Sequence, residues 1–273
     1  MVNAVPVMDL EERATRVRRN VLEAIHAVGT GHEGTSLSVI DVLVSLYFRV
    51  ARHDPSNPTD PDRDRILLSK GHGAPALYGV LAEAGYLPVN ELRSLRQLGS
   101  RLQGHPNSNA LPGVDACTGS LGQGLSQGLG MALGLRLQGR PGRVFCVLGD
   151  GELQEGQNWE AAMAAAHYGV PNLLVIVDRN GLQSDGPTEE TLALGDVTAK
   201  WRSFGWSAVP VDGHDFAAIE AAMLAGLAAN GPAAIIAETV KGKGVGYMEG
   251  AVEWHHKPMS DDDLGRALLE LGS

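Results

Sequence analysis

The sequence predicts an α/β fold, with an open, mostly parallel sheet that carries helices on both faces. Two short runs, residues 143–148 and 173–177, are apolar almost throughout, as expected of parallel strands that are covered on both faces. Helical patterns alternate with these and with further apolar runs, which is typical of an open α/β sheet. No repeat, low-complexity tract or linker interrupts the pattern, so we expect residues 1–273 to form a single domain.

The first half of the chain is predicted to contain several helices and one strand. An amphipathic helix over residues 10–28 places Val17, Val21, Leu22 and Ile25 on one face. A glycine-containing loop follows, and small hydroxyl residues that suit an N-cap then favour a helix over residues 38–50. Beyond it we expect a strand at 64–69, a helix at 74–84 and an ordered loop at 101–115.

The second half continues the alternation. Residues 122–137 have helical spacing but include Gly124, Gly128, Gly130 and Gly134. Because each glycine costs up to about 1 kcal/mol in a helix relative to alanine, their repetition predicts that another element or a ligand packs close by. The remaining expected elements are helices at 159–168, 216–229 and 259–273, and strands at 143–148, 173–177, 208–211 and 233–237.

Composition excludes several classes of function. The formal charge of −10 argues against a nucleic-acid surface, which needs clustered Lys and Arg. No stretch reaches the roughly twenty apolar residues that span a bilayer, and no signal peptide is apparent, so no membrane partner is expected. The cysteines, Cys117 and Cys146, are too few for a disulfide framework and are interpreted as small buried side chains, which favours a cytoplasmic location.

Polar residues follow two of the predicted strands. Asp150 comes directly after the strand at 143–148, and Asn180 follows the strand at 173–177. Because ligands of open α/β sheets lie beyond the carboxyl ends of strands, this pair could hold Mg²⁺, which takes oxygen ligands from few protein groups. Gly149 and Gly151 would let the backbone approach a diphosphate closely. Taken alone, Gly-Asp-Gly is more often a surface turn.

This arrangement resembles the thiamine diphosphate motif, a Gly-Asp-Gly followed about thirty residues later by Asn. Further segments resemble the transketolase family in order and spacing: Gly31-His32, Ser69-Lys70-Gly71-His72-Gly73, Gly104-His105-Pro106, Thr118-Gly119-Ser120-Leu121-Gly122-Gln123-Gly124, Gly151-Glu152-Leu153-Gln154-Glu155-Gly156, Asp185-Gly186-Pro187-Thr188 and Lys241-Gly242-Lys243-Gly244. The resemblance covers about residues 13–257. It implies the thiamine diphosphate-binding fold, with Mg²⁺ held by Asp150, Asn180 and the backbone carbonyl of Leu182.

The resemblance also implies roles for individual side chains. His72 and His255 correspond to histidines near the diphosphate, and His32, His105 and His255 to those that contact the sugar donor. Imidazole suits such work because it donates, accepts and changes charge near neutral pH. The cofactor-binding set further includes Gly119, Leu121, Gly149, Gly151 and Glu152, while Glu155 and Glu160 resemble carboxylates that couple two active sites.

A few positions depart from the family or remain open. Glu33 stands where proline is more common, either altering substrate preference or lying as a solvated loop residue. Ser184 replaces a residue that is commonly apolar. His256 is an alternative to His255 as the site histidine, and His214, in a loop, is given no role.

The resemblance implies that half of the active site lies elsewhere. The glutamate that activates thiamine diphosphate and the basic residues that anchor sugar phosphates belong to a pyrimidine-binding domain, for which too few residues follow Lys243. We therefore expect the N-terminal subunit of a split transketolase, assembled with a C-terminal pyrimidine-binding subunit into a heterotetramer and acting on sugar phosphates. The alternatives are a specialised two-carbon transferase, an enzyme similar to deoxyxylulose-phosphate synthase, or a non-catalytic scaffold. Neither donor nor acceptor is specified.

Overall fold

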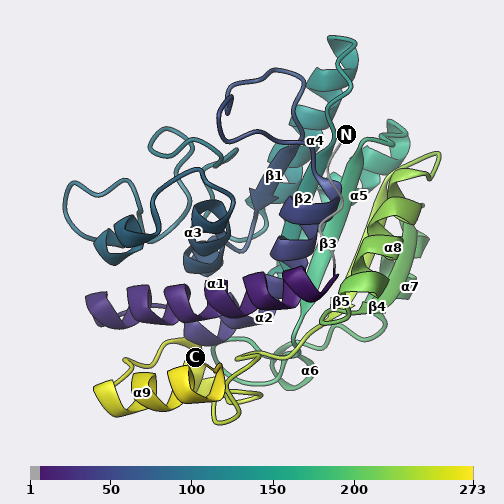
Figure 1. Cartoon of the computed structure of the whole chain (residues 1–273). Coiled ribbons are helices and arrows are strands. Elements are labelled where there is room, and N and C mark those ends of the chain that lie inside the picture. Colours follow the sequence, from purple (N-terminus) through teal and green to yellow (C-terminus); the bar gives the residue numbers. More distant parts are fainter. Residues whose placement is uncertain (1–6, 273) are drawn as a thin grey trace.

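The computed structural model describes residues 7–272. Within them, the strands form one five-stranded sheet in the order β1-β2-β3-β5-β4, and every pairing is parallel (Figure 1). The strands are β1 (Arg65–Leu68), β2 (Val144–Gly149), β3 (Leu173–Arg179), β4 (Ser207–Asp212) and β5 (Ala233–Glu238). The predicted open, parallel sheet is confirmed, and β2 and β3 are buried along almost their whole length.

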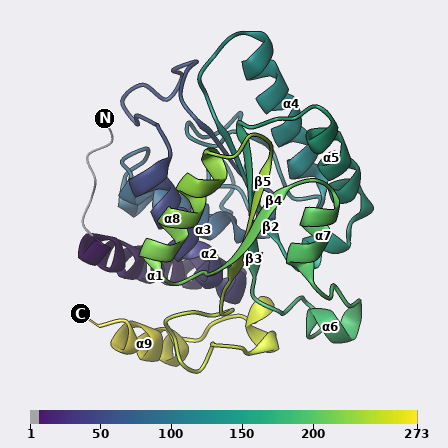
Figure 2. The ribbon, with the colours of Figure 1, turned by 90° about the vertical axis from the view of Figure 1, so that its right-hand side faces the viewer.

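Helices cover both faces of the sheet, as the sequence predicts (Figure 2). On one face lie α1 (Val7–Val28), α2 (Glu33–Ser45), α3 (Ala74–Glu83) and α8 (Phe216–Leu227); on the other lie α4 (Gln123–Leu137), α5 (Gly156–His167) and α7 (Val197–Ser203). Alternate strand residues supply two separate apolar clusters: Phe145 and Val147 face the first group of helices, and Cys146 and Leu148 face the second. This is the two-sided burial that explains the continuously apolar strands.

Shorter elements complete the chain. They are a π-helical turn (Leu46–Val50), the 3₁₀ turns Gly71–Gly73, Val89–Ser94, Gly151–Gln154 and Val252–His255, and the helices α6 (Thr188–Thr191) and α9 (Asp261–Glu270). The last helix begins at a capping box formed by Ser260 and Asp263. It lies beside α1 (Figure 1).

The second helix begins five residues earlier than predicted, at Glu33 rather than Ser38. His32 has non-helical backbone angles (φ −133°, ψ 75°), and the chain is helical from the next residue. The small hydroxyl residues that suggest an N-cap lie inside the helix instead, where Ser38 Oγ donates to Asp178 Oδ2 at 2.7 Å. The prediction was wrong because the backbone is already helical from Glu33, so Thr35 and Ser36 cap no helix end. Thr35 Oγ1 lies 3.4 Å from His72 Nε2, and Ser36 Oγ is buried without a hydrogen-bond partner among residues 7–272.

The glycines of α4 have different environments. A Cβ at Gly124 would lie 2.9 Å from the Cα of Ser69, so the predicted close approach is confirmed there. Nothing lies within 4 Å of a Cβ built at Gly130 or Gly134, and at these positions the prediction was wrong. The close contact brings the start of α4 against the end of β1.

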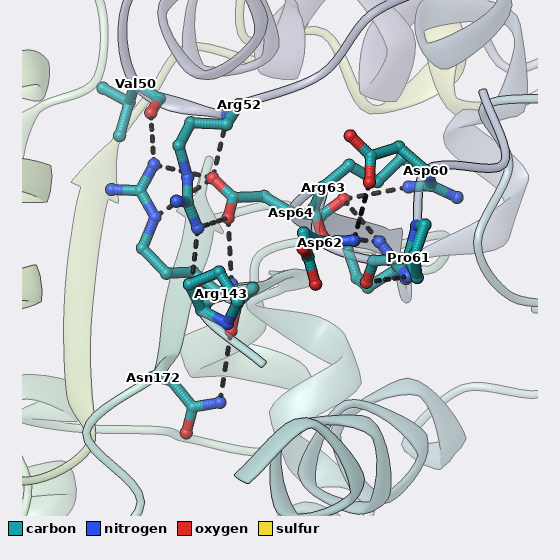
Figure 3. A network of polar contacts seen from close by, with 12 residues as sticks. Val50, Arg52, Asp60, Pro61, Asp62, Arg63, Asp64, Arg143 and Asn172 are labelled. Atoms are coloured by element: carbon teal, nitrogen blue, oxygen red, sulfur yellow. Dashed lines mark hydrogen bonds and ion pairs between the residues drawn. The ribbon is translucent and has the colours of Figure 1, made fainter. Parts of the chain in front are cut away.

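A polar network closes the amino edge of the sheet (Figure 3). The carboxylate of Asp64 accepts hydrogen bonds from the backbone N–H and guanidinium groups of both Arg52 and Arg143, at 2.6–3.0 Å. Arg143 also donates to the carbonyl of Val50. Burial opposes ionisation of Asp64, but these donors outweigh it and lower the pKa of the carboxyl. The network ties β1, β2 and the loop after α2 together at the edge opposite the candidate site.

The expectation for the two cysteines has a mixed outcome. Cys146 is buried as predicted, whereas Cys117 is exposed, because the loop that carries it runs over the surface; both thiols are free. Within residues 7–272, no helix combines the length and the apolar composition needed to cross a bilayer.

Candidate active site

A cavity of about 300 Å³ lies at the carboxyl ends of β2 and β3. The residues that line it are Thr35, Lys70, His72, Leu121, Gly149, Asp150, Gly151, Glu152, Gln154, Glu155, Asn180, Leu182, Gln183, Ser184 and His255. Most of the predicted site residues are in this set. The position follows the rule that ligands of open α/β sheets sit beyond the carboxyl ends of the strands.

The predicted metal-binding pair is brought together by neighbouring strands. Gly149 pairs with Asp178 across β2 and β3, which places Asp150 beside the loop that carries Asn180. The Asp150 carboxylate accepts from the backbone N–H groups of Gly151 (2.8 Å) and Gly181 (2.6 Å). Asn180 Oδ1 accepts from Leu182 N–H at 3.1 Å. Both side chains are thus oriented before any ligand arrives.

The electrostatics of Asp150 fit a cation. Its carboxyl is 3% exposed, and burial together with the nearby Asp178 raises its pKa to about 6, despite the two backbone donors. A divalent ion would remove this cost by favouring the ionised form. Among residues 7–272, no group of three or more His, Cys, Asp or Glu side chains could hold a metal. The carboxylate of Asp150 and the amide oxygen of Asn180 are the kinds of ligand that suit a hard ion which keeps phosphate and water ligands.

Glu152 lines the cavity, but its carboxylate is occupied by protein groups. It accepts from Ser69 Oγ and from the N–H groups of Gly122 (2.9 Å) and Gly149 (3.0 Å). Burial raises its pKa in spite of these donors. The residue predicted to bind cofactor therefore joins β1, α4 and the Gly-Asp-Gly turn, and so shapes the cavity wall.

Lys70 is a cationic side chain of the cavity to which the sequence assigned no role. It is 1% exposed, and its ammonium donates to the carboxylate of Asp178 and to the Thr35 carbonyl at 3.1 Å. The signal for it was present, because Lys70 lies within the Ser-Lys-Gly-His-Gly segment and Asp178 lies at a strand end. A buried lysine at this position can attract a diphosphate.

Lys241 was also missed, although it opens a segment that resembles the family. It is 1% exposed and does not line the cavity, but it contacts two residues that do. Its Nζ atom is 2.9 Å from Nδ1 of His255 and 3.3 Å from the carbonyl oxygen of Gln183. Burial and the charge of Lys70 lower its pKa to about 8, so the ammonium form still prevails at neutral pH.

Four imidazole rings pack together at one end of the cavity. The ring centroid of His32 lies 5.2 Å from that of His72, 5.4 Å from that of His255 and 4.9 Å from that of His256. Burial, reinforced by neighbouring cations and imidazoles, lowers the pKa values of His32, His72 and His255 to about 3, 2 and 4. These rings are therefore neutral at pH 7 and can both donate and accept hydrogen bonds.

The cluster favours His255 over His256 as the site histidine. His255 lines the cavity and contacts Lys241, whereas His256 stacks on His32 outside the lining.

Two predicted residues, His105 and Glu155, lie at the rim, and a third, Glu160, is exposed further along the chain in α5. His105 is exposed, and its ring lies 3.2 Å from the position of a Cβ on Gly119, which needs φ +148°. Glu155 lines the cavity mouth and is exposed.

The interpretation of Glu33 as a solvated loop residue was wrong. Its side chain is 0% exposed at the start of α2, and neither carboxylate oxygen has a hydrogen-bond partner among residues 7–272. Burial raises its pKa to about 7, and the charge of Arg96 only partly offsets this. Ser184, the other departure, lines the cavity and donates to Asp185.

The site and the fold together define a thiamine diphosphate-binding domain. Residues 11–273 match the family described as transketolase, thiamine diphosphate binding domain. The chain belongs to the transketolase family, and the predicted resemblance is confirmed.

Two relatives match the chain from end to end. It is 42% identical over 265 residues to the 6-deoxy-6-sulfo-D-fructose transketolase subunit SqwG of Clostridium sp. (strain MSTE9), covering 97% of this chain and 96% of the relative. It is also 42% identical over 266 residues to an apulose-4-phosphate transketolase subunit of Actinobacillus succinogenes, covering 96% of both.

A solved structure of transketolase from Campylobacter jejuni superposes with a TM-score of 0.93 at 30% identity. The match covers 98% of this chain and 43% of that one. The chain therefore spans less than half of this larger relative.

Proposed function

We propose that this chain is the N-terminal, diphosphate-binding subunit of a split transketolase, a transferase that moves a two-carbon ketol unit from a ketose donor to an aldehyde acceptor. One observation carries the proposal. The oxygen ligands of Asp150 and Asn180, which suit a cation with a diphosphate, and the cluster of neutral imidazoles lie in the same cavity. A scaffold without cofactor would have no need of this pairing. The two end-to-end relatives, both named as transketolase subunits, support it.

In this proposal the pocket holds thiamine diphosphate and Mg²⁺. Asp150, Asn180 and the carbonyl of Leu182 bind the ion, Gly149 and Gly151 let the backbone approach the diphosphate, and Lys70 attracts it. Thiamine diphosphate, when bound, supplies the carbon nucleophile that cleaves and re-forms the bond to the ketol unit. Leu121, which lines the cavity, and Gly119 would face its rings.

The histidines bind and orient the sugar. Because His32, His72 and His255 are neutral, they can hydrogen-bond to sugar hydroxyls without burying a charge. His255, whose Nδ1 accepts from Lys241, has its Nε2–H left to donate. His105, at the rim, completes the contact with the donor. The arrangement is able to hold a polyol and to move protons at its hydroxyl groups.

The proposed assembly is a heterotetramer with two copies of a pyrimidine-binding subunit. Glu155 at the cavity mouth and Glu160 in α5 are both exposed, which supports an interface on this side of the chain. We further propose that residues 1–273 form one domain, because both apolar clusters pack on a single sheet. The free thiols, one of them exposed, are consistent with a cytoplasmic location.

Sugar phosphates remain the proposed substrate class, although the similar subunits differ in their named ketoses, 6-deoxy-6-sulfo-D-fructose and apulose 4-phosphate. We therefore propose the reaction that these subunits share and do not specify one ketose donor. Profiling ketoses and aldehydes with the assembled enzyme would identify the pair used.

Asp150→Ala tests the proposed site. We expect it to weaken Mg²⁺-dependent thiamine diphosphate binding by at least roughly 10- to 100-fold, a loss that follows even from altering outer-shell partners of metal sites. Calorimetric titration of the chain, assembled with its co-purified partner, measures this affinity, and Asp62→Ala, on the opposite edge of the sheet, is the control. Unchanged affinity in Asp150→Ala would rule out the proposed metal ligand.

A further inference from the structure

The segment that carries Lys241 is held at both ends by one buried polar triad. The N–H of Val240 donates to Nε2 of His214 at 2.9 Å, and Nε of Arg18 donates to the carbonyl of Lys243 at 3.0 Å. Asp41 links the two residues that make these hydrogen bonds, since its Oδ2 lies 2.7 Å from both His214 Nδ1 and Arg18 Nη2. The triad of Arg18, Asp41 and His214 therefore spans the turn in which Lys241 sits.

The triad draws on distant parts of the chain and is largely hidden from water. Arg18 lies on α1, Asp41 on α2 and His214 in the loop between β4 and α8. Asp41 is 4% exposed and Arg18 is 6% exposed. Burial opposes the charge on Asp41, but Arg18 and His214 outweigh it and lower its pKa.

The hydrogen bonds fix the tautomer of His214. A backbone N–H can only donate, so Nε2 must accept from Val240 and carry no proton. Nδ1 then bears the proton and donates it to Asp41. The ring is thus held in one orientation, with its acceptor directed at the backbone beside Lys241.

The geometry of the turn leaves Lys241 little freedom. Gly242 has φ +82° and donates to the carbonyl of Gly34 at 3.0 Å. A Cβ on Gly34 would lie 2.9 Å from Cγ of Lys241, so the lysine stem passes directly over this glycine. Its ammonium then reaches Nδ1 of His255, which leaves the proton of that neutral ring on Nε2.

We infer that Arg18, Asp41 and His214 are positioning residues, which aim Lys241 and through it His255 at the diphosphate and sugar ends of the cavity. None of the three lines that cavity. Replacing a buried ion pair with apolar groups is often neutral for stability, so its presence is not explained by stability alone. The inference rests on the proposed function, because it takes the cavity to be the thiamine diphosphate site.

A double-mutant cycle separates positioning from simple structural support. The variants are His214→Phe, Lys241→Met and their combination, and the readout is the Kd of thiamine diphosphate with Mg²⁺, measured on the chain assembled with its partner. We expect His214→Phe to raise Kd about 10-fold in the wild-type background and less than about 2-fold beside Lys241→Met, as for residues that act through one another. An equal factor in both backgrounds would overturn the inference.

Two more variants make the test specific. His214→Gln retains an acceptor for Val240 and a donor for Asp41, so it should restore most of the affinity. His53 is a matched control: it is partly buried and hydrogen-bonded to the Tyr47 carbonyl and the Tyr86 hydroxyl, but it precedes β1. His53→Phe should lower the Tm and leave Kd unchanged; a rise in Kd equal to that of His214→Phe would contradict positioning.

A spectroscopic readout is independent of affinity. Side-chain ¹⁵N NMR of the wild-type chain should show His255 neutral with its proton on Nε2, and His214→Phe should populate the other tautomer. An unchanged His255 spectrum would contradict the inference.

If His214→Phe does not fold, Asp41→Asn takes its place in the same cycle. Absence of thiamine diphosphate binding by the wild-type assembly would refute the proposed function, whereas binding with additive effects would refute only the positioning role.

Discussion

Glu33 holds a fully buried carboxyl group for which residues 7–272 provide no hydrogen-bond partner. The neighbouring His32 Nδ1 and the Nε of Arg96 are likewise buried without partners in the described chain. Buried polar atoms left unpaired are costly, and each calls for a ligand, a water or a functional reason. Their concentration beside the imidazole cluster is consistent with a polar compartment that substrate or water completes.

Glu33→Gln is expected to stabilise the unliganded chain, increasingly so as the pH rises. The pKa of Glu33 in the folded chain, about 7, lies above the ordinary 4.5. The protonated carboxyl therefore contributes fully to the free energy of unfolding below the unfolded pKa, and this contribution is lost as the pH rises through the folded pKa. Glutamine removes that loss, which is on the order of 3 kcal/mol by pH 8. Denaturant unfolding of both proteins between pH 5 and pH 8 measures the difference. Parallel stability curves would show that Glu33 does not titrate this way.

Some individual residues of the site could be predicted from the sequence, and others could not. Asp150 and Asn180 could be predicted because each directly follows an apolar strand, and parallel strands end at the same edge. His214 could not, because its role depends on Asp41, 173 positions away in sequence. Glu33 was misread since a charged residue in a glycine-containing loop is usually solvated.

At the scale of elements, α4 provides a matched pair of glycine substitutions. Gly124→Ala would drive a methyl group into the backbone of Ser69, and we expect it to destabilise the chain by about 1–3 kcal/mol. Gly130→Ala enters open space in the same helix and should stabilise it by about 0.5–1 kcal/mol. Thermal unfolding of the isolated chain measures both. Equal effects at the two positions would contradict the described packing of α4 against β1.

The network at the amino edge of the sheet predicts a stability effect without a functional one. Asp64→Ala leaves Arg52 and Arg143 without their shared carboxylate (Figure 3), at an expected cost of about 3 kcal/mol. Asp62→Ala, which removes an exposed pair with Arg140, should cost less than about 1 kcal/mol. Both variants should bind thiamine diphosphate as the wild type does. A loss of affinity in Asp64→Ala at temperatures where it is folded would show that the two edges are coupled.

Regular elements with strong patterns were predictable, and short or tertiary ones were not. The apolar runs of β2 and β3 and the amphipathic pattern of α1 were sufficient to predict these elements. The start of α2 was misplaced because the hydroxyl residues that suggest an N-cap lie inside the helix, where Ser38 bonds to Asp178. The seven-residue α7 was missed, since it is too short for a clear period and depends on burial of Trp201 in the second apolar cluster.

At the scale of the whole molecule, a network that stabilises the fold and the candidate site lie at opposite ends of the strands. Its amino edge is closed by the Asp64 network, and its carboxyl edge opens into the cavity with Asp150, Lys70 and the histidines. The cavity is complete towards the sheet but exposed at Glu155 and His105. A second chain placed over this rim would enclose the cavity and supply the groups that this chain is proposed to lack.

The most direct test of the split enzyme is native mass spectrometry of the chain purified from its own cells with Mg²⁺ and thiamine diphosphate. We predict an assembly of two copies of this chain with two of a second chain, carrying one thiamine diphosphate for each pair, and ketol transfer that disappears when the second chain is removed. An assembly of this chain alone that still performs ketol transfer would contradict the proposed split enzyme.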